Sequence, residues 1–229
     1  MKKFIKMAAV VASMAMVLGF LSCGGNEETL NLVGNYSITK IENFSETTQS
    51  GTKTTSKSTV TMPSSSTFRT YGTSIVEYSS GVTLTTEMDY TTAKTESDSG
   101  NTYEVTFAKY TINGVDAGEE AITQMKTVME SQMNDSSWAM MAEMFESTMT
   151  TNADGTWTNN QDPVTSGTYT IDQENSKVLL TTVIENGVEL AEPETEEIDY
   201  SDYGKTLVAT TDMSGNGVTQ TMSVTMTRQ

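Results

Sequence analysis

The chain has 229 residues, with 30 acidic and 13 basic side chains, no histidine and a single cysteine. Without histidine it lacks the commonest general base and the commonest metal ligand, which excludes every catalytic triad that depends on histidine. The formal net charge of −17 repels phosphate backbones, so nucleic acid is excluded as a partner. We therefore predict a protein that is not an enzyme and that holds no metal and no cofactor.

The first predicted element is an export signal over residues 1–22. Lys2, Lys3 and Lys6 precede an apolar run over residues 7–20, which is too short to span a membrane. The run ends at Leu21-Ser22-Cys23-Gly24, which resembles the lipobox of bacterial lipoprotein precursors. Removal of the signal would leave 10 of the 13 basic residues against 30 acidic ones, a net charge of −20.

The lipobox resemblance implies that Cys23 becomes the first residue of the mature protein and carries a diacylglyceryl thioether and an N-acyl chain. At about 0.8 kcal/mol per buried CH₂, two or more such chains make release from a membrane negligible. We expect residues 23–30 to form a tether and the membrane to be a partner through the lipid anchor. Because Gly24 is not an aspartate, the resemblance favours the outer membrane, with the periplasmic and the surface face both open.

Residues 31–229 have the composition of β strands, rich in threonine with scattered valine, tyrosine and isoleucine. Residues 45–66 are mostly serine, threonine, lysine and glycine, which predicts either a long exposed hairpin or a mobile loop. Alternating patterns then predict strands over 102–112, 166–172, 177–184 and 219–228, the last of which should pair with 206–210. Turn signals separate such strands, which indicates antiparallel hairpins: they are Asn113-Gly114, Asp154-Gly155, Asn175-Ser176, Asn186-Gly187 and Asn216-Gly217.

Residues 116–146 have a helical period instead. Asp116-Ala117-Gly118-Glu119 is similar to a capping box, and apolar residues follow it at helical spacing. Asn134-Asp135-Ser136 interrupts the pattern, and Asp135 or Ser136 is expected to cap a second set of turns that carries Trp138 and Phe145. We expect an amphipathic helix, or a broken one, whose Met and Trp face packs on the β structure.

Two features of the sequence allow a metal interpretation. Met125, Met129 and Met133 could offer thioethers to Cu(I), but their stripe continues into residues that ligate nothing, which favours packing. The acidic run over 189–202 could bind calcium, but the β-like alternation within it favours an exposed strand edge. Residues 150–161 have part of an EF-hand spacing without the carboxylates at its first and last positions, which favours a hairpin turn.

Two stretches resemble the lipocalin-like domains of bacterial lipoproteins. Residues 32–38, with Gly34-Asn35-Tyr36, are similar to the G-x-W that opens the first lipocalin strand. Residues 152–157 and 166–171 are similar to the D-G-T-aromatic and G-x-Y-x-I hairpins of the family. The resemblance implies a single domain over 31–229, mainly β, built as an antiparallel up-and-down barrel with one mid-chain amphipathic helix. It departs from the family in Tyr36, where tryptophan is usual, and in the position of the helix.

The same resemblance implies two sets of functional residues. Arg228 would stack over Tyr36 and close one end of the barrel. The chain would be a lipid-anchored, non-enzymatic lipocalin-like binding protein for a small apolar or amphipathic ligand, lined by Tyr36, Tyr103, Phe107, Trp157, Tyr169, Met222 and Met226. The alternative is an envelope or surface lipoprotein that acts by protein contact, as an inhibitor, adhesin or accessory subunit. A cavity in the barrel would favour the first, and a solid core with an exposed apolar patch the second.

Overall fold

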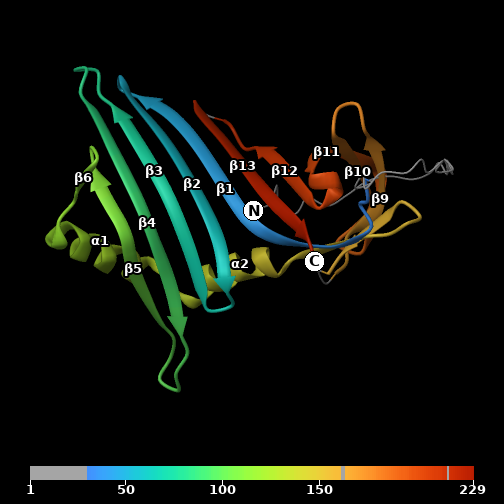
Figure 1. Ribbon diagram of the computed structural model, residues 1–229, viewed down its shortest axis with the longest axis horizontal. Helices are drawn as coiled ribbons and strands as arrows, with labels where there is room; N and C mark the ends of the chain where they lie inside the picture. The colour runs from blue at the N-terminus through green and yellow to red at the C-terminus, as the bar shows by residue number, and fades with distance from the viewer. Residues whose placement is uncertain (1–29, 161–162, 216) are drawn as a thin grey trace, which may run out of the picture. The chain divides into compact units, whose positions relative to one another are not determined.

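The computed structural model describes residues 30–160, 163–215 and 217–229 (Figure 1). The predicted signal peptide over 1–22, the lipidation site Cys23 and the turn residue Asn216 lie outside the described residues. The chain divides into two compact units. The barrel unit comprises the chain up to Ile38, Glu146–Ala209 and Thr225–Gln229, and the sheet unit comprises Thr39–Phe145 and Thr210–Val224.

Eight antiparallel strands form a closed ring, which confirms the predicted fold class. Five of them, β7–β11, lie wholly in the barrel unit, and β1, β12 and β13 extend from it into the sheet unit. In ring order the strands are β1 (Gly34–Gln49), β7 (Thr148–Thr151), β8 (Thr156–Asn159), β9 (Ser166–Asp172), β10 (Lys177–Glu185), β11 (Val188–Ser201), β12 (Thr206–Asp212) and β13 (Val218–Arg228). From β7 to β13 each strand pairs with the next one along the chain, so the connections are up-and-down, and β13 pairs with β1 to close the ring. A one-turn 3₁₀ helix, η2 (Asp202–Gly204), lies between β11 and β12.

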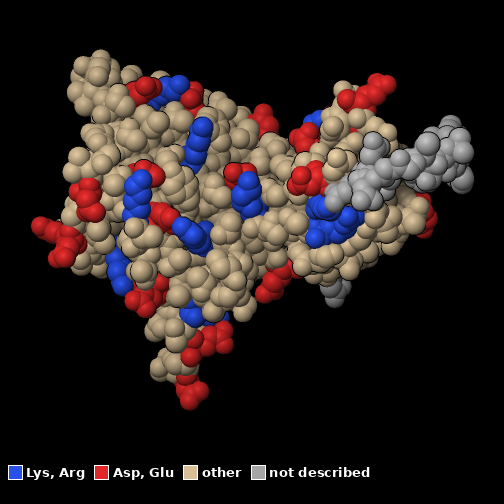
Figure 2. Space-filling model, viewed as in Figure 1, with Lys and Arg blue, Asp and Glu red and all other residues tan. Residues whose placement is uncertain are grey.

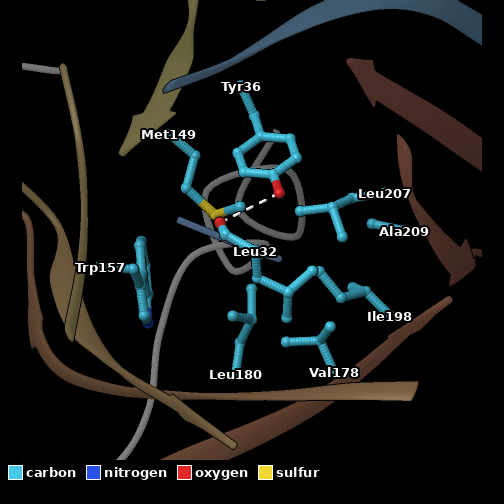
Figure 3. Packing of buried hydrophobic residues seen from close by; sticks show 9 residues of the cluster. All are labelled: Leu32, Tyr36, Met149, Trp157, Val178, Leu180, Ile198, Leu207 and Ala209. Carbon is cyan, nitrogen blue, oxygen red and sulfur yellow. Dashed lines mark hydrogen bonds between the residues drawn. The ribbon is translucent and has the colours of Figure 1, made fainter. Parts of the chain in front are cut away.

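Alternating side chains fill the interior of this ring. In β10, Val178 and Leu180 are both 2% exposed, and Ile198 lies directly opposite Val178 on β11. Figure 3 shows these side chains converging with residues from the other strands. The cluster consists of Leu32, Tyr36, Met149, Trp157, Val178, Leu180, Ile198, Leu207 and Ala209. A ring of eight strands is just wide enough for side chains to fill its interior, and here they form one continuous apolar core.

The sheet unit begins at Thr39, within β1. Its other strands are β2 (Thr52–Ser64), β3 (Thr67–Glu77), β4 (Thr83–Thr95), β5 (Thr102–Ile112) and β6 (Val115–Asp116), each antiparallel to the one before. Residues 45–66 form most of the long β1–β2 hairpin, which settles the alternative between hairpin and loop. Its turn, Ser50-Gly51, has positive φ at both positions, as does Asn113-Gly114 between β5 and β6. Two-residue turns of this kind match the twist of the strands that they join.

The segment predicted as a helix or a broken helix forms two helices, α1 (Glu119–Gln132) and α2 (Asp135–Glu146). The break falls at Met133 and Asn134, within one residue of the predicted interruption. In Figure 1 both helices cross the sheet behind its strands. Phe68 of β3 contacts Trp138 and Phe145 of α2, so the Met and Trp face packs on the sheet unit. β1 and β7 are neighbours in the ring, and β2–β6 and both helices form one insertion between them in the chain. This insertion explains why the helices come in the middle of the sequence.

The predicted caps of the two helices were wrong by one or two residues. Gly118, with φ of 80°, is the N-cap of α1 and makes no side-chain hydrogen bond, so the capping box is absent. Asp116 instead accepts a hydrogen bond from the Gly118 N–H in the turn before the helix. Asn134 caps α2 by accepting from the Ser137 N–H at 2.9 Å, and the Ser137 hydroxyl accepts from the Asn134 N–H at 3.1 Å. This reciprocal pair leaves the Asp135 side chain free for other contacts.

The face of β1–β5 turned away from the helices carries paired charges. Figure 2 shows basic and acidic side chains interspersed over these strands. Lys53 bonds Glu46 at 2.9 Å, and Lys109 bonds Glu87 at 2.6 Å. Arg69 and Asp89 form a two-pronged pair, with Nε–Oδ1 at 3.0 Å and Nη2–Oδ2 at 2.7 Å. The face is therefore polar and nearly balanced in charge, and the apolar surface of the sheet lies on the helix side.

Candidate binding site

The seven predicted ligand residues divide between the two units. Four of them belong to the barrel unit and three to the sheet unit. The barrel set is Tyr36, Trp157, Tyr169 and Met226, and the sheet set is Tyr103, Phe107 and Met222. Tyr36 and Trp157 are fully buried and Met222 is 2% exposed, whereas the other four are partly exposed.

Tyr36 lies in the core of the barrel and bonds the backbone of two other segments. Its hydroxyl donates to the Leu32 carbonyl at 3.0 Å and to the Gly204 carbonyl at 2.5 Å (Figure 3 shows the bond to Leu32). These bonds join β1 to the segment before it and to η2. Burial raises the pKa of the Tyr36 hydroxyl to about 12, although the nearby Arg228 opposes the rise. A buried phenol held by two backbone carbonyls secures the fold, and it is poorly placed to meet a ligand.

Arg228, the predicted partner of Tyr36, joins the end of β13 to the segment that precedes β1. Its Nη1 donates to the carbonyls of Asn31 at 2.6 Å and Val33 at 3.5 Å. Its aliphatic part covers Gly34, where a Cβ atom would lie 2.7 Å from the arginine Cδ. Gly34 also has a φ of 152°, so a larger residue there would be strained as well as crowded. The glycine of the predicted G-x-aromatic motif therefore leaves room for this arginine.

The helix-side face of the sheet unit carries a row of aromatic rings. Phe107 of β5 lies 5.4 Å from Tyr90 of β4 and 5.7 Å from Tyr110 of β5, between ring centroids. The register puts Phe107 directly opposite Tyr90 and Val105 opposite Thr92, which shares its face with Phe68. This places the row on the helix side. Phe107 and Tyr90 are only partly buried, so the row is incompletely covered.

Helix α1 covers this row loosely. Its apolar residues Ile122, Met125 and Met129 share one helix face and are half-buried, and no residue of α1 is fully buried. By contrast, α2 buries Trp138 and Phe145. Since α1 contacts β5, which carries Phe107 and Tyr110, we infer that its half-buried methionine face is turned towards the aromatic row. Methionine side chains adapt to ligands of irregular shape, which suits a cover that moves.

Polar bonds hold α1 along the edge of β5. Glu130 accepts a hydrogen bond from the Val105 N–H at 2.8 Å, and Lys126 bonds Glu104 at 3.3 Å and Glu130 at 3.6 Å. The Val105 N–H lies on the side of β5 that has no neighbouring strand at this point. These contacts fix the edge of the helix and leave its apolar face to rest on the aromatic row.

Tyr103 has a structural role at the start of α2. Its hydroxyl donates a short hydrogen bond to Asp135, which also accepts from Asn101 Nδ2 at 2.7 Å. Burial and the bond to Asp135 raise the pKa of Tyr103 to about 12, and the two donors lower the pKa of Asp135. The Tyr103 ring also contacts Trp138, with centroids 5.6 Å apart. Tyr103 therefore ties α2 to β5 beside the aromatic row.

Sequence reasoning missed Tyr90 and Tyr110. Tyr90 ends an alternation with Leu84, Thr86 and Met88 in β4, a period of two that could have identified the strand and its apolar face. Tyr110 does not follow the alternation of Val105 and Phe107 in the sequence, so it was not assigned to their face. The cause is a β-bulge, since the register of β4 and β5 shifts between Asp89 and Tyr90.

The described residues offer neither a cluster of metal ligands nor a helix that could span a membrane. No group of three or more Cys, Asp or Glu side chains in the described ranges is arranged to hold a metal ion. None of the helices found there is both long and apolar enough to cross a bilayer. The acidic run over 189–202 lies mostly in β11, where Asp199 is paired with Lys177 at 2.6 Å.

The fold and the site define the chain as a closed eight-stranded antiparallel barrel joined to a helix-covered sheet. Neither a protein-family model nor a curated protein matches its sequence. The lipocalin-like resemblance, the lipobox resemblance and the ligand residues therefore stay predictions.

Proposed function

We propose that the chain is a lipid-anchored, non-enzymatic binding protein that holds a small apolar or amphipathic molecule between α1 and the aromatic row of β4 and β5. The observation that carries this proposal is the contrast between the two apolar interiors. The barrel core is filled by side chains less than 8% exposed. The row of Tyr90 and Phe107 is partly exposed beneath a helix that buries none of its residues completely.

The chemistry of the site favours an apolar body on the ligand. Rings at 5.4 and 5.7 Å from one another offer a continuous apolar surface, and the half-buried methionines of α1 offer a second one. Complete burial of an apolar side chain contributes about 1.5–3 kcal/mol, so an apolar ligand that completes the burial of this layer would gain affinity from several side chains at once. The pair Lys126 and Glu104 at the helix edge can meet a polar end.

Membrane attachment through Cys23 is part of the proposal and is supported by the lipobox resemblance. Acylation would keep the binding unit beside the bilayer, where apolar molecules concentrate. Cys23→Ser should abolish palmitate labelling and move the protein from the membrane fraction to the soluble fraction. Unchanged labelling and fractionation would refute the anchor while leaving the binding proposal standing.

Native mass spectrometry of the full chain, purified in mild detergent from its own membrane, tests the binding proposal. A retained ligand adds a discrete mass, which Phe107→Ala should reduce at least about tenfold in occupancy. Ile75→Ala is the matched control, because Ile75 is an apolar β3 residue on the opposite face and 38% exposed. Wild-type protein that carries no added mass and binds no apolar fluorescent probe would overturn the proposal.

Action by protein contact is the second candidate. Apolar side chains are exposed on and beside the helices, with Val115 at 69%, Met140 at 52% and Val128 at 49%. Exposed apolar side chains that lie near one another are typical of surfaces that bind another protein. A stoichiometric protein mass in the same native spectra, lost in Met140→Glu and kept in Phe107→Ala, would support contact and exclude the ligand proposal.

A further inference from the structure

Two buried polar atoms of the barrel unit have no hydrogen-bond partner. They are Nε1 of Trp157 and the hydroxyl oxygen of Thr182, and both residues are 0% exposed. Other buried polar groups of the unit are paired: the Tyr36 hydroxyl donates to two carbonyls, and the Thr165 hydroxyl accepts from the Asn186 N–H at 3.1 Å. Buried polar groups in native proteins nearly always have a partner, so two orphans in one unit call for an explanation.

The strand register places the two orphans on either side of one glycine. Trp157 lies directly opposite Gly167 on the β8–β9 ladder, and Thr182 lies directly opposite the same glycine on the β9–β10 ladder. Residues directly opposite each other in a sheet share a face. Because Trp157 belongs to the barrel core, this shared face is the interior one. Indole and hydroxyl therefore face the barrel interior across Gly167.

Gly167 brings the two groups within reach of one atom. A Cβ on this residue would lie 3.0 Å from Trp157 Nε1, so the indole nitrogen lies over Gly167, the residue directly opposite Thr182. Trp157 and Thr182 belong to the two strands that flank β9, and neighbouring strands are about 4.7–4.9 Å apart. One oxygen at about 2.8–3.0 Å from each group can bridge polar atoms that are separated by up to about 6 Å. Figure 3 shows the indole nitrogen at the end of the ring that points away from the Tyr36 hydroxyl.

The hydrogen-bonding properties and the burial of the two groups limit which kind of atom can bridge them. The indole N–H only donates, so the missing partner must accept, and the threonine hydroxyl can do either. Both groups are completely buried and neither carries a charge, and burial of an isolated ion is costly. The donor N–H also disfavours a cation. An uncharged oxygen fits both conditions.

We propose that Trp157 and Thr182 form an internal site in the barrel for one neutral oxygen, either a water molecule or the hydroxyl or carbonyl oxygen of a small uncharged molecule. The site is independent of the aromatic row under α1, and it holds whether or not that row binds a ligand. Internal waters commonly make about three hydrogen bonds to buried groups, which this arrangement can begin to supply. The absent side chain of Gly167 lets the indole nitrogen approach the strand closely, since a Cβ there would lie only 3.0 Å from Trp157 Nε1.

The test uses the full chain labelled with ¹⁵N at its two indole groups, with Trp138→Phe to assign the signals. We expect the Trp157 N–H to show a cross-peak to water, or to a bound molecule that native mass spectrometry detects as added mass. The first result identifies water as the source of the oxygen, and the second identifies a ligand. Thr182→Val should shift the Trp157 N–H signal and leave that of Trp138 in place.

A crystal structure at better than about 2 Å gives the decisive observation, and it needs no variant to fold. An oxygen within hydrogen-bond distance of both Trp157 Nε1 and Thr182 Oγ1 would support the proposal. Density that is empty at this position, together with a Trp157 N–H that has no cross-peak to any non-protein proton, would overturn it. A partner found for the indole among the chain's own atoms would overturn it as well.

Discussion

Replacement of Tyr36 by phenylalanine removes one buried hydroxyl and keeps the ring that fills the barrel. The hydroxyl donates to the carbonyls of Leu32 and Gly204. Leu32 would still accept from the Thr151 hydroxyl, whereas the Gly204 carbonyl would lose this donor. A buried acceptor without its partner costs about 1–3 kcal/mol. At neutral pH we therefore expect Tyr36→Phe to lower the free energy of unfolding by about 1–3 kcal/mol.

The same substitution should reverse its effect at high pH. Burial raises the pKa of Tyr36 to about 12 in the folded state, against 10.0 for an exposed tyrosine. The unfolded chain therefore loses this proton first, and the stabilisation that is complete below pH 10 is lost as the pH rises towards 12. At about 1.4 kcal/mol for each pH unit, the loss reaches about 2–3 kcal/mol at pH 12. Phenylalanine does not titrate and escapes it.

Urea unfolding followed by far-ultraviolet circular dichroism at pH 8, 10, 11 and 12 measures both effects. All other titrating groups are common to the two proteins, so the difference between their free energies of unfolding isolates Tyr36. Wild type should be the more stable protein at pH 8, and the two curves should meet or cross near pH 12. A difference that stays constant from pH 8 to pH 12 would refute the assigned cause, which is ionisation of a buried phenol.

Three further predictions concern single positions. Gly167→Ala should destabilise the protein by at least about 1–3 kcal/mol in urea unfolding, because its Cβ would lie 2.1 Å from the Thr181 carbonyl oxygen. Gly72→Ala, with 3.7 Å to the nearest atom, is the control, and equal effects would contradict the crowding. Asp135→Asn should show less acid destabilisation than wild type below about pH 4, since hydrogen bonds lower the pKa of this carboxyl and its stabilisation is lost as the pH falls. Met129→Asp should lower the free energy of unfolding by about 1–2 kcal/mol, because the residue is half-buried; no change in urea midpoint would mean that α1 does not rest on the sheet.

The strands that alternate clearly between apolar and polar residues were predicted well. The last strand was expected over 219–228 and spans Val218–Arg228, next to β12 as predicted. The Asn186-Gly187 turn has positive φ at both residues, as its sequence indicates. These features depend on local chemistry, in which neighbouring residues carry the whole signal.

The β1–β2 hairpin could not be predicted with the same security. Most of its residues in 45–64 are serine, threonine and lysine, and most of these are half-buried, on both faces of the strands. A strand whose two faces are similar has no hydrophobic period, so its register comes from its neighbours. Here β3 supplies the missing information, since ten residue pairs join it to β2.

The candidate site shows the same limit. Phe107 was predicted because it alternates with Val105, but its partner Tyr90 lies seventeen residues earlier and becomes a neighbour only through the β4–β5 register. Tyr36 and Trp157 were predicted to line a ligand cavity, and in the structure they belong to the packed core of the barrel. Residue type alone could not distinguish an aromatic side chain that fills a core from one that lies beneath a partly buried helix.

The sheet unit has an outer edge at β5, and the means by which the chain covers it connects the fold to the proposed site. An unpaired strand edge attracts other strands, so proteins cover or charge it. Here the Val105 N–H donates a hydrogen bond to the Glu130 carboxylate, and the Ala117 N–H donates to the Tyr110 carbonyl at 3.0 Å. The helix that protects the edge is α1, which also lies over the aromatic row. If α1 moves to admit a ligand, these edge bonds must break and then re-form. A bound ligand would hold α1 against the sheet, so amide hydrogen exchange at Val105 should become slower when the ligand is present. Exchange at Thr92, which lies inside the sheet, should stay unchanged.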